Sequence, residues 1–245
     1  MNLLFYAIEE FYGMCTHMAE ANSDSAYTNE QMTRFKSILK RVRQSNVSVP
    51  TISTDNSAAL LTKKLVHFDP FELLSQPNAD TRGFVRTGGA IFGQRPSFHQ
   101  LRAVSTLTAS IRHVAVLDKG ESVGYDRAYV ADRPIRMATI ALGFADGYPR
   151  ELGNEKGKVA IHGSVFPIIG NICMDMLMVE LGDADDQRGP GSKVCVGDIA
   201  VFWGPEHDED GDGVVRLQDV ASTLNTTLSA LTCALSPRVR REYVE

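Results

Sequence analysis

A change of sequence pattern near residue 100 constrains the fold of this chain more than any other feature. Before it, strand-like and helix-like segments alternate, as where Thr51–Asp55 is followed by Ala58–Leu65. After it, segments rich in β-branched residues, from Ser105 to Val130 and from Ile135 to Val201, are separated by turn sequences. Alternation predicts an α/β unit with a parallel sheet, and closely spaced strands and turns predict an antiparallel β unit. We therefore expect two domains, with a boundary between about Gly93 and Ser105.

The longest helical pattern follows a capping-box signature, Thr28 with Gln31 three residues later. Apolar residues then recur at helical spacing as far as Val42, which predicts an amphipathic helix that ends near Ser45 and Asn46.

Shorter elements are predicted on both sides of the boundary. Two further strands are expected over Tyr12–Ala19 and Gly83–Phe92, and one last helix over Leu217–Leu231.

Composition excludes several classes of protein. The chain has 245 residues, of which 43% are hydrophobic and 22% charged, and these values are typical of globular domains. The sequence holds no apolar run that approaches the roughly 18 residues of a membrane helix. The formal net charge of −5 gives no electrostatic basis for binding nucleic acid or anionic lipid. We therefore expect a globular protein that binds neither nucleic acid nor membrane.

The cysteines indicate neither a zinc site nor a redox pair, because none of them forms a C-x-x-C motif. Each stands among apolar residues, so we expect reduced, buried thiols and an intracellular compartment. The four residues are Cys15, Cys173, Cys195 and Cys233.

Tyr125 is the first candidate for chemistry, because Gly120 and Gly124 frame it at the end of a predicted strand. A tyrosine acts as a general base only if nearby cations or donors lower its pKa from about 10. The alternative is a simple hairpin with two packed tyrosines.

Two other segments of the second half carry similar signals. Gly143–Arg150 combines small residues with an Asp-Gly turn, and the alternative is a strand followed by a loop. Gly170–Met176 places Asp175 in an apolar run, where a buried carboxylate needs hydrogen-bond partners. This favours a site, and the alternative is the end of a strand.

In the first half, polar residues stand at the predicted carboxyl ends of strands, where barrel-like α/β folds carry their chemistry. These are Thr16-His17, Asn56-Ser57 and Arg86 to Gly89. The backbone N–H groups of Gly88 and Gly89 could bind a phosphate, helped by the Ser57 hydroxyl at a helix N-terminus.

An acidic segment between Asp208 and Asp219 has the residue spacing of an EF-hand calcium loop. Its entering segment, Ile199–Trp203, is strand-like rather than helical. We interpret it as an acidic β turn, with a cation site as the alternative.

Taken together, these segments resemble the C-terminal part of the alanine racemases, from about Gly13 to Tyr243. The most specific matches are Gly120–Tyr125 (GESVGY), Gly143–Arg150 (GFADGYPR), Pro167–Asp175 (PIIGNICMD) and Leu235–Val239 (LSPRV). The resemblance implies a partial TIM (β/α) barrel over residues 1–98, followed by a mostly antiparallel β domain over residues 99–245. It also implies the cofactor pyridoxal 5'-phosphate, a cytoplasmic enzyme, and interconversion of L-alanine and D-alanine by two bases, a tyrosine and a lysine.

The resemblance assigns roles to individual residues. It implies that Tyr125 is one catalytic base, that His17 hydrogen-bonds this tyrosine, and that Arg86 faces the pyridine nitrogen of the cofactor. It places Ser57, Gly88 and Gly89 at the cofactor phosphate, and Met174 and Asp175 at the substrate carboxylate. In the family the tyrosine and the Met-Asp segment enter from the partner subunit, which implies a homodimer with shared active sites.

Three departures from the family pattern matter. Phe144 stands where many relatives have tyrosine, and Ser229 falls where many have a tyrosine that contacts the phosphate. The family's cofactor lysine and its substrate-binding arginine lie in a segment that would precede Met1. We read Lys36, Lys40, Lys63 and Lys64 as surface residues on helices and not as replacements for that lysine.

Three functions follow as alternatives. The first is an alanine racemase polypeptide whose lysine-bearing segment is absent from this chain, so that the chain alone is inactive. The second is a related racemase for serine or a broader set of amino acids, because of Phe144 and Ser229. The third is a non-catalytic remnant or a dimerisation domain. Because part of a barrel leaves open sheet edges, we also expect the chain alone to be poorly soluble.

Overall fold

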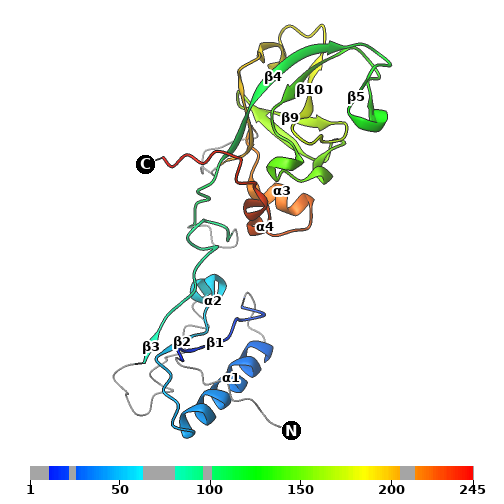
Figure 1. Cartoon of the computed structure of the whole chain (residues 1–245). Coiled ribbons are helices and arrows are strands. Elements are labelled where there is room, and N and C mark those ends of the chain that lie inside the picture. Colours follow the sequence, from blue (N-terminus) through cyan, green and yellow to red (C-terminus); the bar gives the residue numbers. More distant parts are fainter. Residues whose placement is uncertain (1–10, 22–25, 63–80, 96–100, 205–212, 245) are drawn as a thin grey trace. The chain divides into compact units, whose positions relative to one another are not determined.

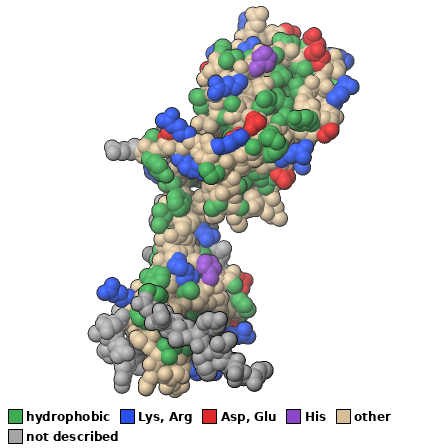
Figure 2. All heavy atoms as spheres, in the orientation of Figure 1, with side chains coloured by type: hydrophobic (Ala, Val, Ile, Leu, Met, Phe, Trp, Pro, Cys, Tyr) green, Lys and Arg blue, Asp and Glu red, His purple; other side chains and the backbone are tan. Residues whose placement is uncertain are grey.

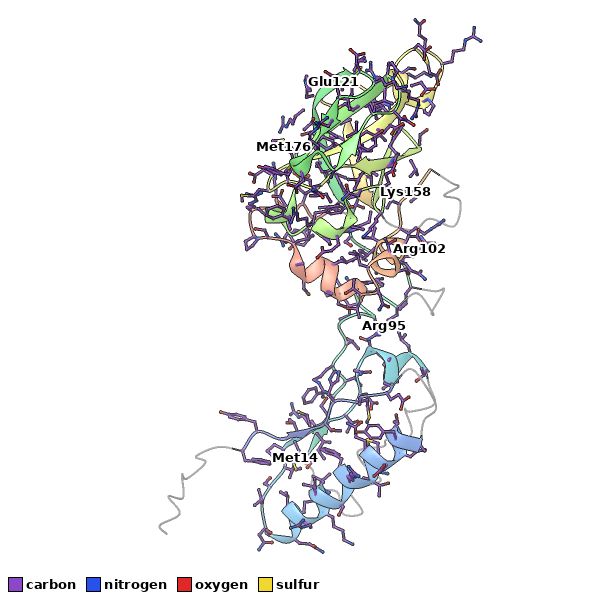
Figure 3. The ribbon with its side chains drawn as sticks, turned by 90° about the vertical axis from the view of Figure 1, so that its right-hand side faces the viewer. Met14, Arg95, Arg102, Glu121, Lys158 and Met176 are labelled. Atoms are coloured by element: carbon purple, nitrogen blue, oxygen red, sulfur yellow. The ribbon has the colours of Figure 1, made fainter. Side chains whose placement is uncertain are left out.

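The computed structural model describes residues 11–21, 26–62, 81–95, 101–204 and 213–244. The chain divides into two compact units, Met1–Leu101 and Arg102–Glu245. Figure 3 labels Met14 and Arg95 in the first unit, and Arg102, Glu121, Lys158 and Met176 in the second. The first unit is α/β and the second is a closed antiparallel barrel, so the predicted fold class is confirmed.

The first unit is built on a three-stranded parallel sheet in the order β1-β2-β3 (Figure 1). Its strands are β1 (Met14–Cys15), β2 (Thr51–Ser53) and β3 (Arg82–Gly83). The helices of this unit are α1 (Ala26–Gln44), which connects β1 to β2, and α2 (Ser57–Thr62), which follows β2. This is the strand–helix–strand connection that parallel pairing requires.

Helix α1 packs against the sheet through the apolar face that the sequence predicts. Phe35 and Leu39, one turn apart, form a buried cluster with Val49 and Ile52. The helix ends as predicted, because Asn46 adopts a left-handed conformation with φ 58°, which is common after a helix C-terminus.

Three predictions for this unit are wrong in detail. The strand expected over Tyr12–Ala19 is limited to Met14–Cys15. Thr28 and Gln31 do not cap the helix, which begins two residues earlier at Ala26. The hydroxyl of Thr28 instead donates to the Glu20 carbonyl, because its side chain is buried against the preceding loop. The strand expected over Gly83–Phe92 ends at Gly83, and residues 88–93 form turns in which Ile91 N donates to the Gly88 carbonyl.

The second unit is a closed six-stranded barrel in the order β10-β7-β4-β11-β8-β9. All of its pairings are antiparallel. The strands are β4 (Leu107–Leu117), β7 (Ile135–Ile140), β8 (Lys158–Ile161), β9 (Ser164–Ile169), β10 (Leu177–Asp183) and β11 (Ile199–Trp203). The barrel interior is one apolar cluster that includes Ile111, Ile140 and Phe202.

Smaller elements surround this barrel and carry much of the site described below. They are the hairpin β5 (Ser122–Val123) and β6 (Tyr129–Val130), the single turns η1 (Tyr125–Arg127), η2 (Phe144–Asp146), η3 (Arg150–Leu152) and η4 (Pro190–Lys193), and the helices α3 (Leu217–Thr223) and α4 (Leu228–Ala234). The single helix expected over Leu217–Leu231 is therefore wrong. It is interrupted at Asn225, which has a φ of 50°, and Thr227 caps the second helix by accepting a hydrogen bond from Ala230 N.

The expectation of buried cysteines is also wrong. Cys15, Cys195 and Cys233 are exposed and Cys173 is half-buried, and all four are free thiols. Their positions at element ends and turns expose them despite apolar neighbours in sequence.

The remaining surface features are briefly stated. Within the described ranges, no helix is long and apolar enough to cross a membrane. On the face shown in Figure 2, acidic and basic side chains of the second unit are interspersed. Asp208, Asp210, Lys63 and Lys64, which entered the sequence predictions, lie outside the described residues.

Candidate active site

In the first unit, the predicted site residues gather just beyond the carboxyl ends of the three parallel strands. His17 follows β1 by two residues, Ser57 follows β2 by four, and Arg86 follows β3 by three. An isolated bridge between Asn56 and Arg86 continues the pairing of β2 with β3 to this point. The sheet therefore brings these side chains together, as expected for a barrel-like α/β unit.

Arg86 is the centre of this cluster. Its Nη1 donates to the Ser53 hydroxyl, its Nη2 donates to the Thr16 carbonyl at 2.8 Å, and the same Nη2 lies 3.3 Å from His17 Nδ1. An arginine carries its protons at all ordinary pH values and can only donate. The charged guanidinium is a strong donor toward His17 Nδ1, which favours the tautomer of the neutral imidazole that carries its proton on Nε2.

Asn56 stands on the other side of the imidazole and orients the turn after β2. Its Oδ1 accepts from Ala58 N and Ala59 N, both at 3.1 Å, and so caps α2. This fixes which end of the amide is the NH₂ group, and that Nδ2 donates to the Met18 carbonyl at 3.3 Å and lies 3.4 Å from His17 Nε2. Donors therefore face both ring nitrogens, and the charged Arg86 at Nδ1 is the stronger of the two. The sequence predicts Asn56 and Ser57 as a helix cap at a strand end, but it does not predict the contact of Asn56 with His17.

Asp55 lies beneath this cluster and is 8% exposed. Burial raises the pKa of its carboxyl, and the Thr54 hydroxyl and the charge of Arg86 partly oppose the rise. The cation of Arg86 therefore has a nearby acidic group whose ionisation the fold disfavours.

Ser57 and the turn after Arg86 form the predicted phosphate-binding group. The Ser57 hydroxyl accepts from Gly88 N at 3.0 Å and from Ala90 N at 3.2 Å, so two backbone donors converge on one oxygen. Beside the turn, Arg95 Nε lies 3.3 Å from the position of a Cβ on Gly89. That Nε is buried and has no hydrogen-bond partner within the part of the chain that the structure describes. Because Gly88 N and Ala90 N already donate to Ser57, the group beside this turn that favours an anionic ligand is the Arg95 guanidinium.

In the second unit, Tyr125 begins the turn η1 and its ring is 65% exposed. The backbone around it is unusual, because Gly124, Asp126 and Arg127 have φ values of 77°, 63° and 52°. Asn171 Nδ2 holds this turn by donating to the Tyr125 carbonyl at 3.1 Å. The side chain of Tyr125 is therefore exposed, and the backbone that carries it is held in place by the hydrogen bond from Asn171.

Met174 and Asp175 lie in the loop between β9 and β10. The loop is exposed, so the expectation that Asp175 is buried in an apolar run is wrong. The reason is that the chain turns here, with Cys173 N donating to the Met176 carbonyl at 2.9 Å.

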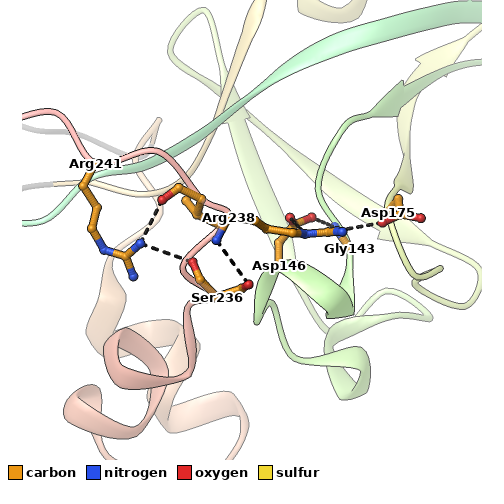
Figure 4. Close-up of polar contacts among 7 residues, drawn as sticks. Gly143, Asp146, Asp175, Ser236, Arg238 and Arg241 are labelled. Carbon is orange, nitrogen blue, oxygen red and sulfur yellow. Dashed lines mark hydrogen bonds and ion pairs between the residues drawn. The ribbon is translucent and has the colours of Figure 1, made fainter.

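Arg238 links this loop to the segment Gly143–Arg150, as Figure 4 shows. Its Nε donates to Asp146 Oδ1 and its Nη2 donates to Asp175 Oδ1, both at 2.7 Å. The other oxygen of Asp146 accepts from Gly143 N at 2.9 Å. The two loops are also joined directly, because Ala145 N donates to the Met174 carbonyl at 3.0 Å.

A buried ring anchors the base of the same segment. Tyr148 is 1% exposed and packs edge-on against Phe202, with ring centroids 4.9 Å apart. Burial raises the pKa of its phenol. Tyr148 is therefore part of the core, whereas Phe144 in η2 is 40% exposed beside the loop of Met174.

The eight predicted site residues thus form two clusters, one in each unit. In the first unit, Arg86 contacts His17 directly. Asn56, the residue before Ser57, contacts the other nitrogen of the same imidazole. In the second unit, the turn of Tyr125 and the loop of Met174 are joined through Asn171. Asn171 and Arg238 lie within motifs that the sequence analysis identifies, but neither was predicted as a site residue. The sequence does not show their partners, because Asn171 bonds to Tyr125, 46 residues away, and Arg238 bonds to Asp146 and Asp175, 92 and 63 residues away.

Comparison with known protein families assigns both parts of the chain. Residues 104–243 match the model of the alanine racemase C-terminal domain, and residues 7–96 match that of the alanine racemase N-terminal domain. Among curated proteins, the alanine racemase of Halothermothrix orenii is 32% identical over 237 residues, which are 94% of this chain and 56% of that protein. The chain therefore spans little more than half the length of the curated relatives it matches.

Solved structures give the same result. An alanine racemase from Bartonella henselae with covalently bound pyridoxal phosphate has a TM-score of 0.72 and 28% identity, covering 96% of this chain and 57% of that one. An alanine racemase from Bacillus anthracis with bound L-Ala-P has a TM-score of 0.73 and 25% identity, covering 94% of this chain and 54% of that one.

Proposed function

The chain belongs to the alanine racemase family, and from that premise we propose that it supplies the tyrosine half of a pyridoxal-phosphate-dependent active site that interconverts L-alanine and D-alanine. The observation that carries this proposal is the 3.3 Å contact of Arg86 Nη2 with His17 Nδ1 at the strand ends. The same unit carries a phosphate-type turn, and the second unit carries an exposed tyrosine; a protein without catalytic function has no chemical need to keep all three features.

Tyr125 is the proposed catalytic base on one face of the substrate. Its role is to take the α-proton onto its phenolate oxygen and to return a proton from the same atom. The left-handed backbone on both sides of the ring and the hydrogen bond from Asn171 limit where that oxygen can lie. Orientation of this kind lowers the entropic cost of the transfer.

His17 and Arg86 support that phenolate. Because Arg86 occupies Nδ1, the imidazole keeps its proton on Nε2 and can donate it in a hydrogen bond to a tyrosinate oxygen. The guanidinium also places a positive charge behind the imidazole, which favours the anionic form of a tyrosine in contact with it.

The residues of the first unit fit the cofactor pyridoxal 5'-phosphate. Ser57, Gly88 and Gly89 would hold its phosphate, and the Nε of Arg95 beside Gly89, buried and without a hydrogen-bond partner among the described residues, fits an anion there. Arg86 would face the pyridine nitrogen and, being unable to give up a proton, would leave that nitrogen unprotonated. When bound, the cofactor supplies the electron-withdrawing ring that stabilises negative charge at the substrate α-carbon.

Met174 and Asp175 are proposed to meet the carboxylate end of the amino-acid substrate. The negative charge of Asp175 would repel that carboxylate, and the ion pair with Arg238 offsets it. In the assembled enzyme we propose a homodimer with shared active sites, located in the cytoplasm and binding neither nucleic acid nor membrane.

The second base is proposed to be a lysine that this 245-residue chain does not carry at a matching position. Lys36 and Lys40 lie on α1, away from the strand ends that carry His17 and Arg86. We therefore propose that this polypeptide alone does not racemise alanine, because a racemase needs the lysine both to anchor the cofactor and to act on the opposite face.

A complementation assay tests the function directly. The N-terminal barrel segment of an alanine racemase, carrying its lysine, is joined to residue 11 of this chain, and alanine racemisation is followed by the loss of optical rotation. We expect activity that requires pyridoxal phosphate and that Tyr125→Phe reduces by about 10²-fold or more. A well-folded, cofactor-loaded fusion without activity would instead favour the non-catalytic reading.

A second candidate is a racemase for serine or for a broader set of amino acids. The observation that favours it is Phe144, which is 40% exposed next to the loop of Met174 and lacks the phenol of many relatives. Ser229 on α4 is the second departure from the family pattern. Turnover of a panel of amino acids by the same fusion decides between alanine and larger substrates.

A further inference from the structure

Gln31 makes three hydrogen bonds that no capping role explains. Its Nε2 donates to the His17 carbonyl at 2.7 Å and to the Thr16 hydroxyl at 2.9 Å. Its Oε1 accepts from Ala19 N at 3.2 Å. One side chain on α1 therefore holds the chain immediately before and after the imidazole of His17.

These contacts connect to Arg86 through the backbone. Arg86 Nη2 donates to the carbonyl of Thr16 and also meets His17 Nδ1, so the position of Thr16 decides where the guanidinium lies. Strand β1 is short and ends at Cys15, so its ladder does not reach His17. Beyond β1, two sets of hydrogen bonds fix the path of the chain. Thr16 N donates to the Ser53 carbonyl, and Gln31 bonds to Thr16, His17 and Ala19.

We propose that Gln31 is a positioning residue for His17: by fixing residues 16–19 it keeps the imidazole in register with Arg86, and so keeps the ring proton on Nε2. The inference rests on the proposed function, because a fixed Nε2 proton matters only if His17 donates to the catalytic tyrosine. Gln31 itself touches no substrate and no reacting atom.

An alternative role for Gln31 is simply to fill space between α1 and β1. The structure argues against it, because a cleft of about 290 Å³ remains there, lined by Cys15, Thr16 and Gln31 among others. The site therefore tolerates a side chain of similar length, and two substitutions separate packing from hydrogen bonding. Gln31→Met keeps the length without polar atoms, and Gln31→Glu keeps the acceptor but removes both donations.

The test reads the tautomer of His17 by ¹⁵N NMR in the cofactor-free fusion with an N-terminal barrel segment that the complementation assay uses (the unmodified chain below), at alkaline pH where imidazoles are neutral. The His17 signals are identified by their loss in His17→Asn. In the unmodified chain we expect a protonated Nε2 and a strongly separated, unprotonated Nδ1. In Gln31→Met and Gln31→Glu we expect the two signals to move toward each other as the tautomers interconvert. Asn29→Asp, an exposed amide-to-acid change on the same helix, should leave them unchanged.

The outcomes are distinguishable. If the unmodified chain shows the fixed tautomer and both Gln31 variants retain it, the inference about Gln31 is overturned while the proposed function stands. If the unmodified chain shows no fixed tautomer, the contact that carries the proposed function is itself refuted. Should neither variant keep α1 folded, the exchange rate of the Gln31 side-chain amide protons in the unmodified chain decides, because free, rapidly exchanging protons would contradict the two hydrogen bonds that Nε2 donates.

Discussion

At the scale of single residues, Arg86 holds the first cluster together, because its guanidinium contacts Ser53, Thr16 and His17. The guanidinium donates toward the Nδ1 of His17, and Ser53 and Thr16 take its remaining donations. Asn56 Nδ2 is a second donor at the other ring nitrogen, so the Nε2-protonated tautomer follows from the stronger, charged donor at Nδ1. The resemblance places both residues in the site, but only their contact shows how one acts on the other.

Asp55 gives a prediction about pH at the same scale. Because burial raises the pKa of its carboxyl above the ordinary value of 3.8, the folded state favours the protonated form. Its contribution to stability is therefore present at low pH and is lost as the pH rises through the unfolded and then the raised folded value. Asp55→Asn carries no such charge, so its stability relative to the unmodified chain should increase from about pH 3.5 upward.

Urea unfolding of the two proteins at a series of pH values, followed by far-UV circular dichroism, measures this difference. Glu20→Gln, an exposed acid-to-amide change in the same unit, is the control and should give a difference that is flat with pH. A difference that falls as the pH rises would show that attraction between Asp55 and Arg86 outweighs burial.

At the scale of elements, close approach between two loops defines the substrate side of the second cluster. A Cβ added to Gly143 would lie 2.2 Å from the Met174 carbonyl oxygen. Backbone cannot yield as a side chain can, so Gly143→Ala must push η2 and the β9–β10 loop apart. We expect a loss of about 1–3 kcal/mol in the free energy of unfolding, the range for overpacking.

The matched control is Gly204→Ala, because a Cβ there would meet its nearest atom at an ordinary 3.5 Å. Thermal unfolding followed by near-UV circular dichroism reports on the aromatic core around Tyr148. Equal destabilisation by the two substitutions would contradict the close approach of the loops.

Arg238 gives a second prediction for elements. The side chain of Arg238 is 47% exposed and that of Asp175 is 58% exposed, whereas that of Asp146 is 15% exposed. Water that reaches the guanidinium screens both ion pairs, so their contribution to global stability is small. We therefore expect Arg238→Gln to leave the unfolding temperature almost unchanged. Amide hydrogen exchange should nevertheless accelerate at Ala145 and Ser236, whose N–H groups bond within the linked segments.

Arg240→Gln is the control, because it removes a more exposed ion pair, that with Glu242 two residues along the chain, which joins no loops. Mass-spectrometric exchange after proteolysis locates the change. Unaltered exchange over residues 143–147 in Arg238→Gln would show that the backbone hydrogen bonds hold these loops without the ion pairs.

At the scale of the whole molecule, the two units differ in how their sheet edges end. The barrel of the second unit is closed and has no free edge. In the described part of the first unit, β1 and β3 each pair on one side only, with β2. Unpaired edges next to apolar side chains promote association between chains.

We therefore expect residues 102–245, expressed by themselves, to form a single monomeric or dimeric species and to unfold cooperatively. We expect the 245-residue chain to aggregate at the same concentration. Size-exclusion chromatography with light scattering compares the two. A monodisperse full chain would show that its exposed edges are protected, and aggregation of residues 102–245 would locate the problem in the second unit instead.

The sequence by itself determined the classes of both units and the motifs of the site. Local rules produce these signals: hydrophobic period separates the helix of Phe35 and Leu39 from the strands of the barrel, and turn residues separate the strands. The same local rules predicted the wrong helix start, at Thr28, and a single helix in place of α3 and α4. They also predicted that Asp175 and the cysteines are buried, which is wrong.

Only the tertiary structure decided which polar groups meet. Gln31 does not cap α1 as expected but donates hydrogen bonds to Thr16 and His17. Arg238 donates to Asp146 and Asp175, which lie 92 and 63 residues away in the chain. Such pairs have no sequence period, because a side-chain hydrogen bond depends on where two elements pack and not on the spacing of residues between them. The physical reason is that hydrophobic pattern selects elements, whereas packing selects the partners of their polar side chains.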